Sequence, residues 1–303
     1  MMQTKSKLFF ISKRNVDLFV KFILLFAALF TVAAIIIIIY TLVYESLSFF
    51  SQVSLNEFIF GTKWAALFDD RSFGTIPLLI GTLLTTSIAL SLAIPLGIGS
   101  AAFLSEYASR DIRKIVKPII EILAGIPTVV YGYFALYFIT PNLRYFIPDL
   151  YAYNALSAGI AMGIMIVPTI TTLTEDAFYL VPNSLKSAGY ALGARKSIVI
   201  LKIVIPYSIS TIFATIILAM GRAIGETMIV TIAAGLKPTL TINPFESIMT
   251  MTAAIAQAAT GDAPHGTLEY TSLFAVATYL FVIVALLNLI SNYIRSKWEI
   301  KHD

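Results

Sequence analysis

The chain of 303 residues is too apolar and too poor in charge to be a soluble protein. Hydrophobic residues make up 58% of it and charged residues 13%, and the mean hydropathy is +0.86. Soluble domains carry about 25% charged residues, so lipid must be the solvent for much of this surface. The sequence has no cysteine, which excludes disulfides and thiolate chemistry and restricts metal ligands to oxygen and imidazole groups.

The first apolar run covers residues 22–44 and contains no charged residue. It exceeds the roughly 20 residues that a helix needs to cross a bilayer. A secretory signal would have an apolar stretch of about 7–15 residues and a small-residue cleavage site, which this run lacks. The sequence therefore predicts an uncleaved membrane anchor helix.

Five further apolar runs predict membrane spans, at residues 75–105, 118–140, 154–174, 206–235 and 269–294. Pro77 and Pro95 predict a kink or break in the first of these five, and Gly125-Ile126-Pro127 and Pro168 predict bends in the next two. Proline within a membrane helix is tolerated where neighbouring groups satisfy the freed carbonyl.

Small residues recur four positions apart in two of these runs, as Gly159/Gly163 and Gly221/Gly225. Such pairs let helices approach closely. Helix packing is the simplest interpretation of both.

Lysine and arginine are unevenly distributed between the loops. One set of alternating segments contains Lys5, Lys7, Lys13, Arg14, Lys21, Arg110, Arg113, Lys114, Lys117, Lys186, Arg195, Lys196, Lys202, Arg295, Lys297 and Lys301, and the other set contains Lys63, Arg71, Arg144 and Lys237. This bias of about four to one places the richer set in the cytoplasm. The prediction is an all-α polytopic membrane protein with six transmembrane helices and both termini cytoplasmic. Topology thus accounts for the basic pI, and no nucleic-acid partner is expected.

Residues for catalysis are scarce. His265 and His302 are the only histidines, and the sequence contains neither H-E-x-x-H nor the phosphate loop G-x-x-x-x-G-K-[ST]. The carboxylate pairs Asp69/Asp70 and Glu175/Asp176 lie at span ends or in loops, where solvated side chains are expected. The chain is therefore not expected to be an enzyme, and any ATP-driven work requires a separate ATPase chain.

The longest inner loop covers residues 175–206 and predicts a short amphipathic helix near 183–194. Pro182-Asn183-Ser184 resembles a turn followed by a helix N-cap. Gly193 can supply a left-handed exit from the helix. The residues on one face are Leu185, Ala188 and Leu192. This helix either binds another protein or packs beneath the bundle.

The same loop resembles the E-A-A-x3-G-x9-I-x-L-P signature of binding-protein-dependent ABC importer permeases. It reads Ser187-Ala188-Gly189, then Gly193, then Ile203-Val204-Ile205-Pro206 in the same register. Ser187 replaces the glutamate, Gly189 the second alanine and Ile205 the leucine. The resemblance implies a coupling helix that docks into a groove of a cytoplasmic ATPase, with Ser187, Ala188, Gly189, Gly193, Ile203 and Pro206 as the coupling residues.

Residues 101–133, 221–230 and 261–277 resemble the phosphate-uptake branch of that family, specifically its C-type Pst permeases. The resemblance covers about residues 75–294. It implies the type I ABC importer permease fold over 73–294, an N-terminal tail, first helix and external loop over 1–72, and a cytoplasmic tail over 295–303. The expected location is a bacterial or archaeal cell membrane, and the expected cargo is inorganic phosphate.

Arg222 and Glu226 form a charged pair within the fifth span, at i and i+4 on one helical face. An unpaired charge at the bilayer centre costs roughly 2.5–3.5 kcal/mol, so both should face the bundle interior or water. They are either a mutually neutralising structural pair or a point in an anion pathway. Arginine suits phosphate oxygens, and both residues belong to the family's motif, which favours the pathway.

Glu121 follows Pro118 at the expected start of the third span. A carboxylate in the first turn of a helix interacts favourably with the helix dipole. We expect a helix-capping role for Glu121, with a place in the pathway as the alternative.

The resemblance also implies the assembly. Its members would be an A-type Pst permease in a heterodimer with this chain, two cytoplasmic ABC ATPase subunits and an extracytoplasmic phosphate-binding protein. No cofactor is expected on this chain, because ATP and Mg would bind to the ATPase. The alternatives are a permease for another oxyanion such as sulfate or molybdate, or an ATP-independent channel or secondary carrier. A carrier would be supported by an inverted repeat, and none is convincing here.

Overall fold

The computed structural model describes residues 13–67, 70–264 and 266–298. The regular structure of these residues is helical, apart from one isolated antiparallel bridge between Trp64 and Phe73. The α-helices are α1 (Lys13–Phe50), α2 (Leu55–Phe60), α3 (Ile76–Ala102), α4 (Arg110–Gly125), α5 (Thr128–Phe134), α6 (Thr140–Arg144), α7 (Ala155–Tyr179), α8 (Asn183–Ala191), α9 (Lys196–Val199), α10 (Ile205–Tyr207), α11 (Ile209–Ile224), α12 (Met228–Ala233), α13 (Met251–Gln257) and α14 (Leu268–Trp298). The π-helical turns are η1 (Phe103–Tyr107), η2 (Ala135–Ile139), η3 (Ile200–Val204) and η4 (Ala258–Asp262).

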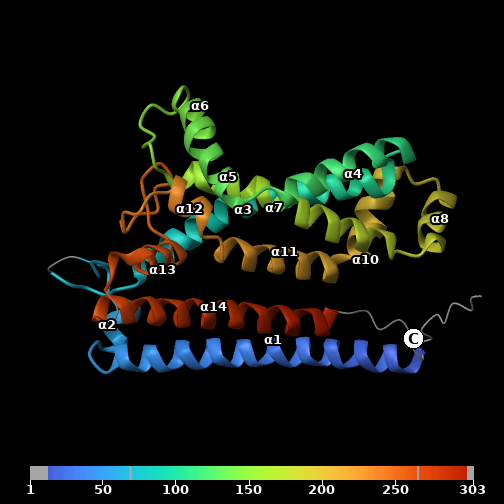
Figure 1. The fold of residues 1–303 in the computed structure, drawn as a ribbon. Coiled ribbons are helices and arrows are strands. Elements are labelled where there is room, and N and C mark those ends of the chain that lie inside the picture. Colours follow the sequence, from blue (N-terminus) through green and yellow to red (C-terminus); the bar gives the residue numbers. More distant parts are fainter. Residues whose placement is uncertain (1–12, 68–69, 265, 299–303) are drawn as a thin grey trace, which may run out of the picture.

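The helices form layers around one central pair. Helices α3 and α7 pack along each other, α11 lies against α7 and α14, and α1 packs on the outer side of α14 (Figure 1). Helix α1 begins and α14 ends at the end of the molecule that carries α8, whereas α6, α12 and α13 lie toward the opposite end (Figure 1). We call these the α8 end and the α6 end.

Within the part of the chain that the structure describes, four continuous helices are long and apolar enough to cross a membrane. They are Asp17–Phe50, Ile76–Tyr107, Ala155–Tyr179 and Leu268–Ile290. Two bent pairs raise the number to six if each pair is one span. The prediction of an all-helical membrane protein is thus confirmed, but two of the six predicted spans are not continuous helices.

The predicted span 118–140 is divided by a 91° bend between Arg110–Gly125 and Thr128–Arg144. Ile126 lies at the break with ψ 129°, because a residue that precedes proline is pushed out of the helical region. Pro127 then caps α5 with ψ 136°. The bend predicted at this point is confirmed, and it is far sharper than a kink.

The predicted span 206–235 is also wrong as a single helix. Helix α11 ends at Ile224 with Gly225 as its C-cap, and α12 begins three residues later at Met228. A second bend of 72° separates Lys196–Tyr207 from Ile209–Ile224. There Ser208 leaves the helix and its hydroxyl donates to the Ala177 carbonyl at 3.1 Å.

The break expected in the second span does not occur, because α3 continues through Pro95. Close packing with α7 holds this region together. A Cβ on Gly159 would lie 2.7 Å from Ile88, and one on Gly163 would lie 2.9 Å from the Ala89 carbonyl oxygen. The packing role of that pair is confirmed. Gly221, by contrast, has no such neighbour within 4 Å among the described residues.

Candidate functional site

The candidate pathway residue Arg222 lies in the last turn of α11, with an exposed side chain. Its Nη1 atom donates to the Thr169 hydroxyl of α7 at 2.8 Å, which is the guanidinium's one hydrogen bond within the described chain. Arginine has five N–H donors in a rigid fork, so most of its donors have no hydrogen-bond partner among the described residues. An exposed guanidinium on a membrane helix can receive an oxyanion.

Glu226 is not the partner of Arg222. The expected i, i+4 face does not exist, because α11 ends at Ile224 and residues 225–227 are not helical. Glu226 Oε1 instead accepts from the backbone N–H groups of Met228 and Ile229, at 3.0 and 3.2 Å. No ion pair within 4.0 Å joins the two described side chains. The predicted charge pair is therefore wrong.

Glu226 acts as the cap of α12. Its side chain is buried, with 9% of the residue exposed, and its charge faces the positive end of that short helix. Its own carbonyl accepts from the Thr252 hydroxyl at 2.7 Å. Thr252 is hydrogen-bonded in turn to Thr250, the N-cap of α13. Glu226 thus fixes the junction between α11, α12 and α13.

The short helix predicted near 183–194 is present as α8, over Asn183–Ala191. Gly193 has φ +78°, which confirms the left-handed exit. The Gly193 N–H donates to the Tyr190 carbonyl at 2.9 Å and the Ala194 N–H to the Gly189 carbonyl at 3.2 Å. These two bonds form a Schellman motif, which satisfies the last carbonyls of the helix. The expected N-cap is wrong, since Pro182 occupies that position without a side-chain bond.

The coupling residues separate into a buried and an exposed group. Gly189 is buried, and a Cβ there would lie 2.6 Å from Ile203 Cδ1. Ser187, Ala188 and Pro206 are exposed. Leu185 is 42% and Leu192 89% exposed on the predicted apolar face. This face is therefore not covered by the chain itself, unlike a helix that packs beneath a bundle.

An ion pair that the sequence did not reveal holds α8 in place. Lys186 Nζ lies 2.5 Å from Glu106 Oε1 of η1, and the two side chains are 14% and 9% exposed. The same ammonium donates to the Phe178 carbonyl of α7 at 3.2 Å. Nearby, Arg113 of α4 donates to the Leu104 carbonyl at 2.6 Å and lies over the Tyr179 ring. Lys186 and Glu106 are 80 positions apart, and no local pattern signals such a pair.

Two carboxylates differ from their expected roles. Glu175 is 1% exposed rather than solvated, and its Oε2 lies 3.8 Å from Lys117 Nζ. Glu121 is not in a first turn, because α4 begins at Arg110 with Ser109 as its cap. The capping role of Glu121 is therefore wrong. Both carboxylates lie beside the basic residues of α4.

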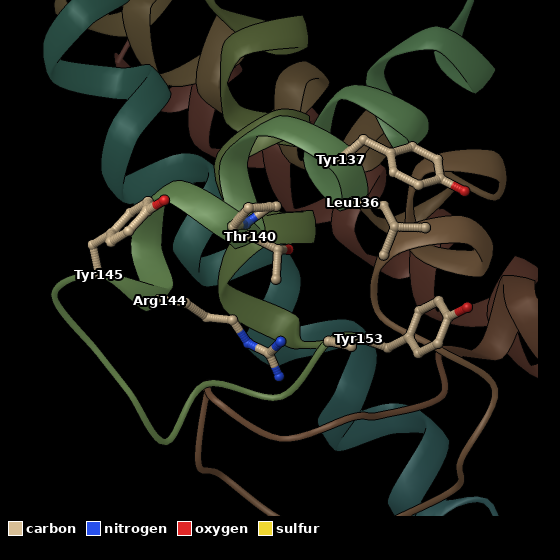
Figure 2. A pocket seen from close by; sticks show the side chains of 8 residues that line it. Leu136, Tyr137, Thr140, Arg144, Tyr145 and Tyr153 are labelled. Carbon is tan, nitrogen blue, oxygen red and sulfur yellow. The ribbon is translucent and has the colours of Figure 1, made fainter.

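A separate cavity of about 490 Å³ lies at the α6 end, around Arg144. Arg144 Nε donates to the Leu150 carbonyl at 2.8 Å. The rings of Tyr137 and Tyr153 lie on either side of Leu136, across the cavity from Tyr145, and their hydroxyls point away from the Arg144 guanidinium (Figure 2). Because its donors do not converge, this cavity is a weaker candidate than Arg222.

Comparison with known proteins gives consistent relatives. The family described as "Binding-protein-dependent transport system inner membrane component" matches residues 93–300. The probable ABC transporter permease protein YqgH of Bacillus subtilis is 32% identical, over 82% of this chain and 80% of its own length. The phosphate transport system permease protein PstC is 36% identical in Mesorhizobium japonicum, over 74% of this chain and 73% of that one. In Haemophilus influenzae it is 30% identical, over 98% of both chains.

Solved structures show the same fold. A bacterial ABC transporter that imports the acidic polysaccharide alginate has a TM-score of 0.67 at 16% identity, covering 94% of this chain and 99% of that one. The MetNI methionine ABC transporter, in inward-facing conformations, has a TM-score of 0.55 at 15% identity, covering 74% and 94%. The predicted permease fold is thus confirmed.

Proposed function

The chain belongs to the family of binding-protein-dependent transport system inner membrane components, and from this premise we propose that it is the permease subunit of an ATP-driven importer of inorganic phosphate. It is a multi-pass protein of the cell membrane and a transport component, not an enzyme. Several relatives at or above 30% identity carry the name of the phosphate permease PstC, which supports phosphate as the cargo.

The observation that carries the proposal is the state of Arg222. Its guanidinium is exposed and held by a single hydrogen bond to Thr169. A charge in a membrane span is costly unless it faces water or a partner, so its retention on α11 indicates a functional contact. Phosphate offers oxygens that match the arginine fork. The single contact with Thr169 leaves the other donors of the guanidinium available to an anion.

The test is uptake of labelled phosphate by cells that express the complete importer. Arg222→Gln keeps a hydrogen-bonding side chain of similar reach but removes the charge, and we expect uptake to fall at least tenfold per importer recovered from the membrane. Lys21→Gln is the control, because Lys21 is an exposed cation of α1 outside the proposed pathway, and its uptake should stay near wild type. Wild-type uptake in Arg222→Gln would contradict the proposal.

Two arms of the same assay address the alternatives. Unlabelled sulfate or molybdate should compete weakly with labelled phosphate, and strong competition would favour another oxyanion as the cargo. In vesicles that contain the complete importer, omitting ATP from the compartment that the α8 end faces should stop phosphate uptake. Continued uptake without ATP would favour a channel or secondary carrier.

We further propose the assembly and orientation. The α8 end faces the cytoplasm, where the exposed face of α8 docks into one of two ABC ATPase subunits that bind ATP and Mg. An A-type Pst permease completes the membrane heterodimer, and an extracytoplasmic phosphate-binding protein delivers the anion at the α6 end. The permease domain is residues 73–294.

The orientation can be tested with cysteine labelling, because the natural chain contains no cysteine. An impermeant thiol reagent added to intact cells should label Asn142→Cys and leave Ser187→Cys unlabelled. Both residues are exposed, so access depends on the side of the membrane. Labelling of Ser187→Cys in intact cells would reverse the proposed orientation.

A further inference from the structure

Helix α4 carries an open groove, lined mostly by the apolar stems of basic side chains, that the proposed pathway does not yet use. None of the helix's residues is buried, and Ser109 caps its start. Four charged residues follow each other along α4 at spacings of four, three and four positions: Arg110, Lys114, Lys117 and Glu121. This spacing places them on one face of the helix over roughly 16 Å. The groove has a volume of about 420 Å³ and is lined by Arg110, Arg113, Lys114, Lys117, Pro118 and Glu121.

The cations of this groove are only partly neutralised. Lys114 is 77% exposed and lies 3.4 Å from the exposed Asp111 carboxylate, a contact that contributes little in water. Lys117 is 42% exposed, and its nearest carboxylate oxygen is Glu175 Oε2 at 3.8 Å. The ammonium groups therefore keep donors for an anion in the groove.

The ion pair between Lys117 and Glu175 leaves one oxygen of the Glu175 carboxylate unpaired. The Glu175 side chain is 2% exposed, and Oε1 has no hydrogen-bond partner among the described residues. A buried carboxylate with an unpaired oxygen draws a nearby cation strongly. Lys117 can thus exchange between Glu175 and an anion, which would lower the affinity of the groove for that anion.

The groove and Arg222 both contact α7. Arg222 donates to Thr169 of that helix, and Lys117 lies 3.8 Å from Glu175 of the same helix. Thr169 and Glu175 are separated by about 9 Å along the helix axis. From there α4 extends toward the α8 end (Figure 1).

The apolar and charged sides of α4 are separate. Ile112, Ile115, Ile119 and Ile122 are 43–67% exposed on another side of the helix. That side suits lipid tails or a partner helix. The charged side includes Glu121 at the inner end, and this carboxylate opposes tight binding of any phosphate group.

We propose that the α4 groove is a release site that binds inorganic phosphate after it leaves Arg222 and before it enters the cytoplasm. This inference rests on the proposed function. The cations of the groove attract the anion along α4, and Glu121 and Glu175 keep the binding weak enough for release.

The test uses the complete importer reconstituted in vesicles, with phosphate preloaded in the compartment that the α8 end faces. Phosphate bound in the groove should block the path, so preloading should slow uptake of labelled phosphate by the wild type. In Lys114→Gln, the preloaded phosphate concentration that halves uptake should be about three- to tenfold higher than in the wild type, as expected for the loss of one charged contact. Lys114→Arg should restore the wild-type value.

The matched control is Lys21→Gln, which neutralises an exposed lysine of α1 on the opposite side of the molecule from α4 (Figure 1). It should leave the preload response unchanged. Arg110→Gln is a second, independent variant of the groove and should repeat the effect of Lys114→Gln. If both groove variants respond like Lys21→Gln while the wild type transports phosphate, the release site is wrong. If the wild type transports no phosphate, the proposed function itself fails.

A lipid arm separates the two sources of phosphate groups. The shift in Lys114→Gln should be the same in vesicles of phosphatidylcholine alone and in vesicles that also contain phosphatidylglycerol. A shift that appears only with phosphatidylglycerol would mean that the groove holds a lipid headgroup, and it would overturn the release site.

Discussion

The α8 end and the junction between α11 and α12 hold their charges in opposite ways. At the α8 end, Lys186 and Glu106 form an ion pair that is almost buried, and a backbone motif at Gly193 fixes the end of the helix. At the junction, Glu226 bonds to backbone N–H groups while Arg222 extends from α11 with one hydrogen bond. One region is fixed by several contacts, and the other leaves a cation available.

This difference agrees with the proposed roles. A helix that transmits a movement from an ATPase must stay fixed relative to the helices that carry it. Several contacts between α8 and its neighbours serve this purpose. A residue that binds an anion must keep hydrogen-bond donors free for it, as Arg222 does. The same helical bundle therefore needs a rigid end and an arginine with free donors, and each can be tested separately.

The largest expected effect comes from Glu106→Gln. The nearly buried Lys186 ammonium would then lose its counter-ion and keep only neutral acceptors, the amide oxygen at position 106 and the Phe178 carbonyl. Loss of one partner of a buried ion pair costs about 3 kcal/mol. We expect a lower Tm of the purified importer and loss of ATP hydrolysis coupled to transport. The double variant Glu106→Gln/Lys186→Met leaves no buried charge and should recover most of the Tm; equal Tm values for the single and double variants would contradict the role of the pair.

A smaller effect is expected at Glu226. Glu226→Ala removes the acceptor for the N–H groups of Met228 and Ile229, at a cost of about 1–2 kcal/mol. Glu226→Gln keeps an oxygen in the same place, so its Tm and phosphate uptake should stay closer to wild type. If Arg222 depended on the Glu226 charge, the Gln variant would lose uptake as fully as the Ala variant. That result would restore the charge pair expected from the sequence.

The left-handed exit of α8 gives a third test. Gly193 has φ +78° and open space around it, so a substitution there introduces backbone strain without a steric clash. Gly193→Ala should cost about 1 kcal/mol, and Gly193→Asn less, because asparagine tolerates this conformation. Coupled ATP hydrolysis should fall in the order Gly, Asn, Ala. Equal activity of all three would show that the turn does not position α8.

The sequence predicted those parts of the fold that depend on local chemistry. Gly193 could be assigned because a glycine after an amphipathic turn is a common helix exit. The break at Ile126 followed from the proline after it. The packing of Gly159 and Gly163 was predicted from their spacing, since only small residues let two helices touch.

The remaining features depend on contacts across the chain. Arg222 and Glu226 have the spacing of a helical pair, but the helix ends between them and the backbone of α12 provides a better partner for the carboxylate. Glu175 resembled a solvated helix end and is buried beside Lys117. Only the tertiary structure brings Lys186 to Glu106, because 80 residues separate them.

The smallest expected effect concerns the loop after α2. Lys63 and Asp70 form an ion pair of 2.5 Å, the same distance as between Lys186 and Glu106, but their side chains are 60% and 89% exposed. A hydrogen bond from Lys63, together with its charge, lowers the pKa of Asp70 below its ordinary value of 3.8. Because the folded pKa is lowered, the pair stabilises the fold above the ordinary pKa, and the effect is lost as the pH falls through the folded pKa.

We therefore expect Asp70→Asn to leave the Tm at pH 7 almost unchanged, since exposed ion pairs contribute little. Any remaining difference from wild type should disappear in acid, below the folded pKa of Asp70. The measurement is the Tm of both proteins across that pH range, with Glu106→Gln measured alongside as the buried pair of equal length. A loss of Tm in Asp70→Asn as large as that in Glu106→Gln would mean that burial does not distinguish the two pairs, and the contrast between the rigid α8 end and the rest of the surface would fail.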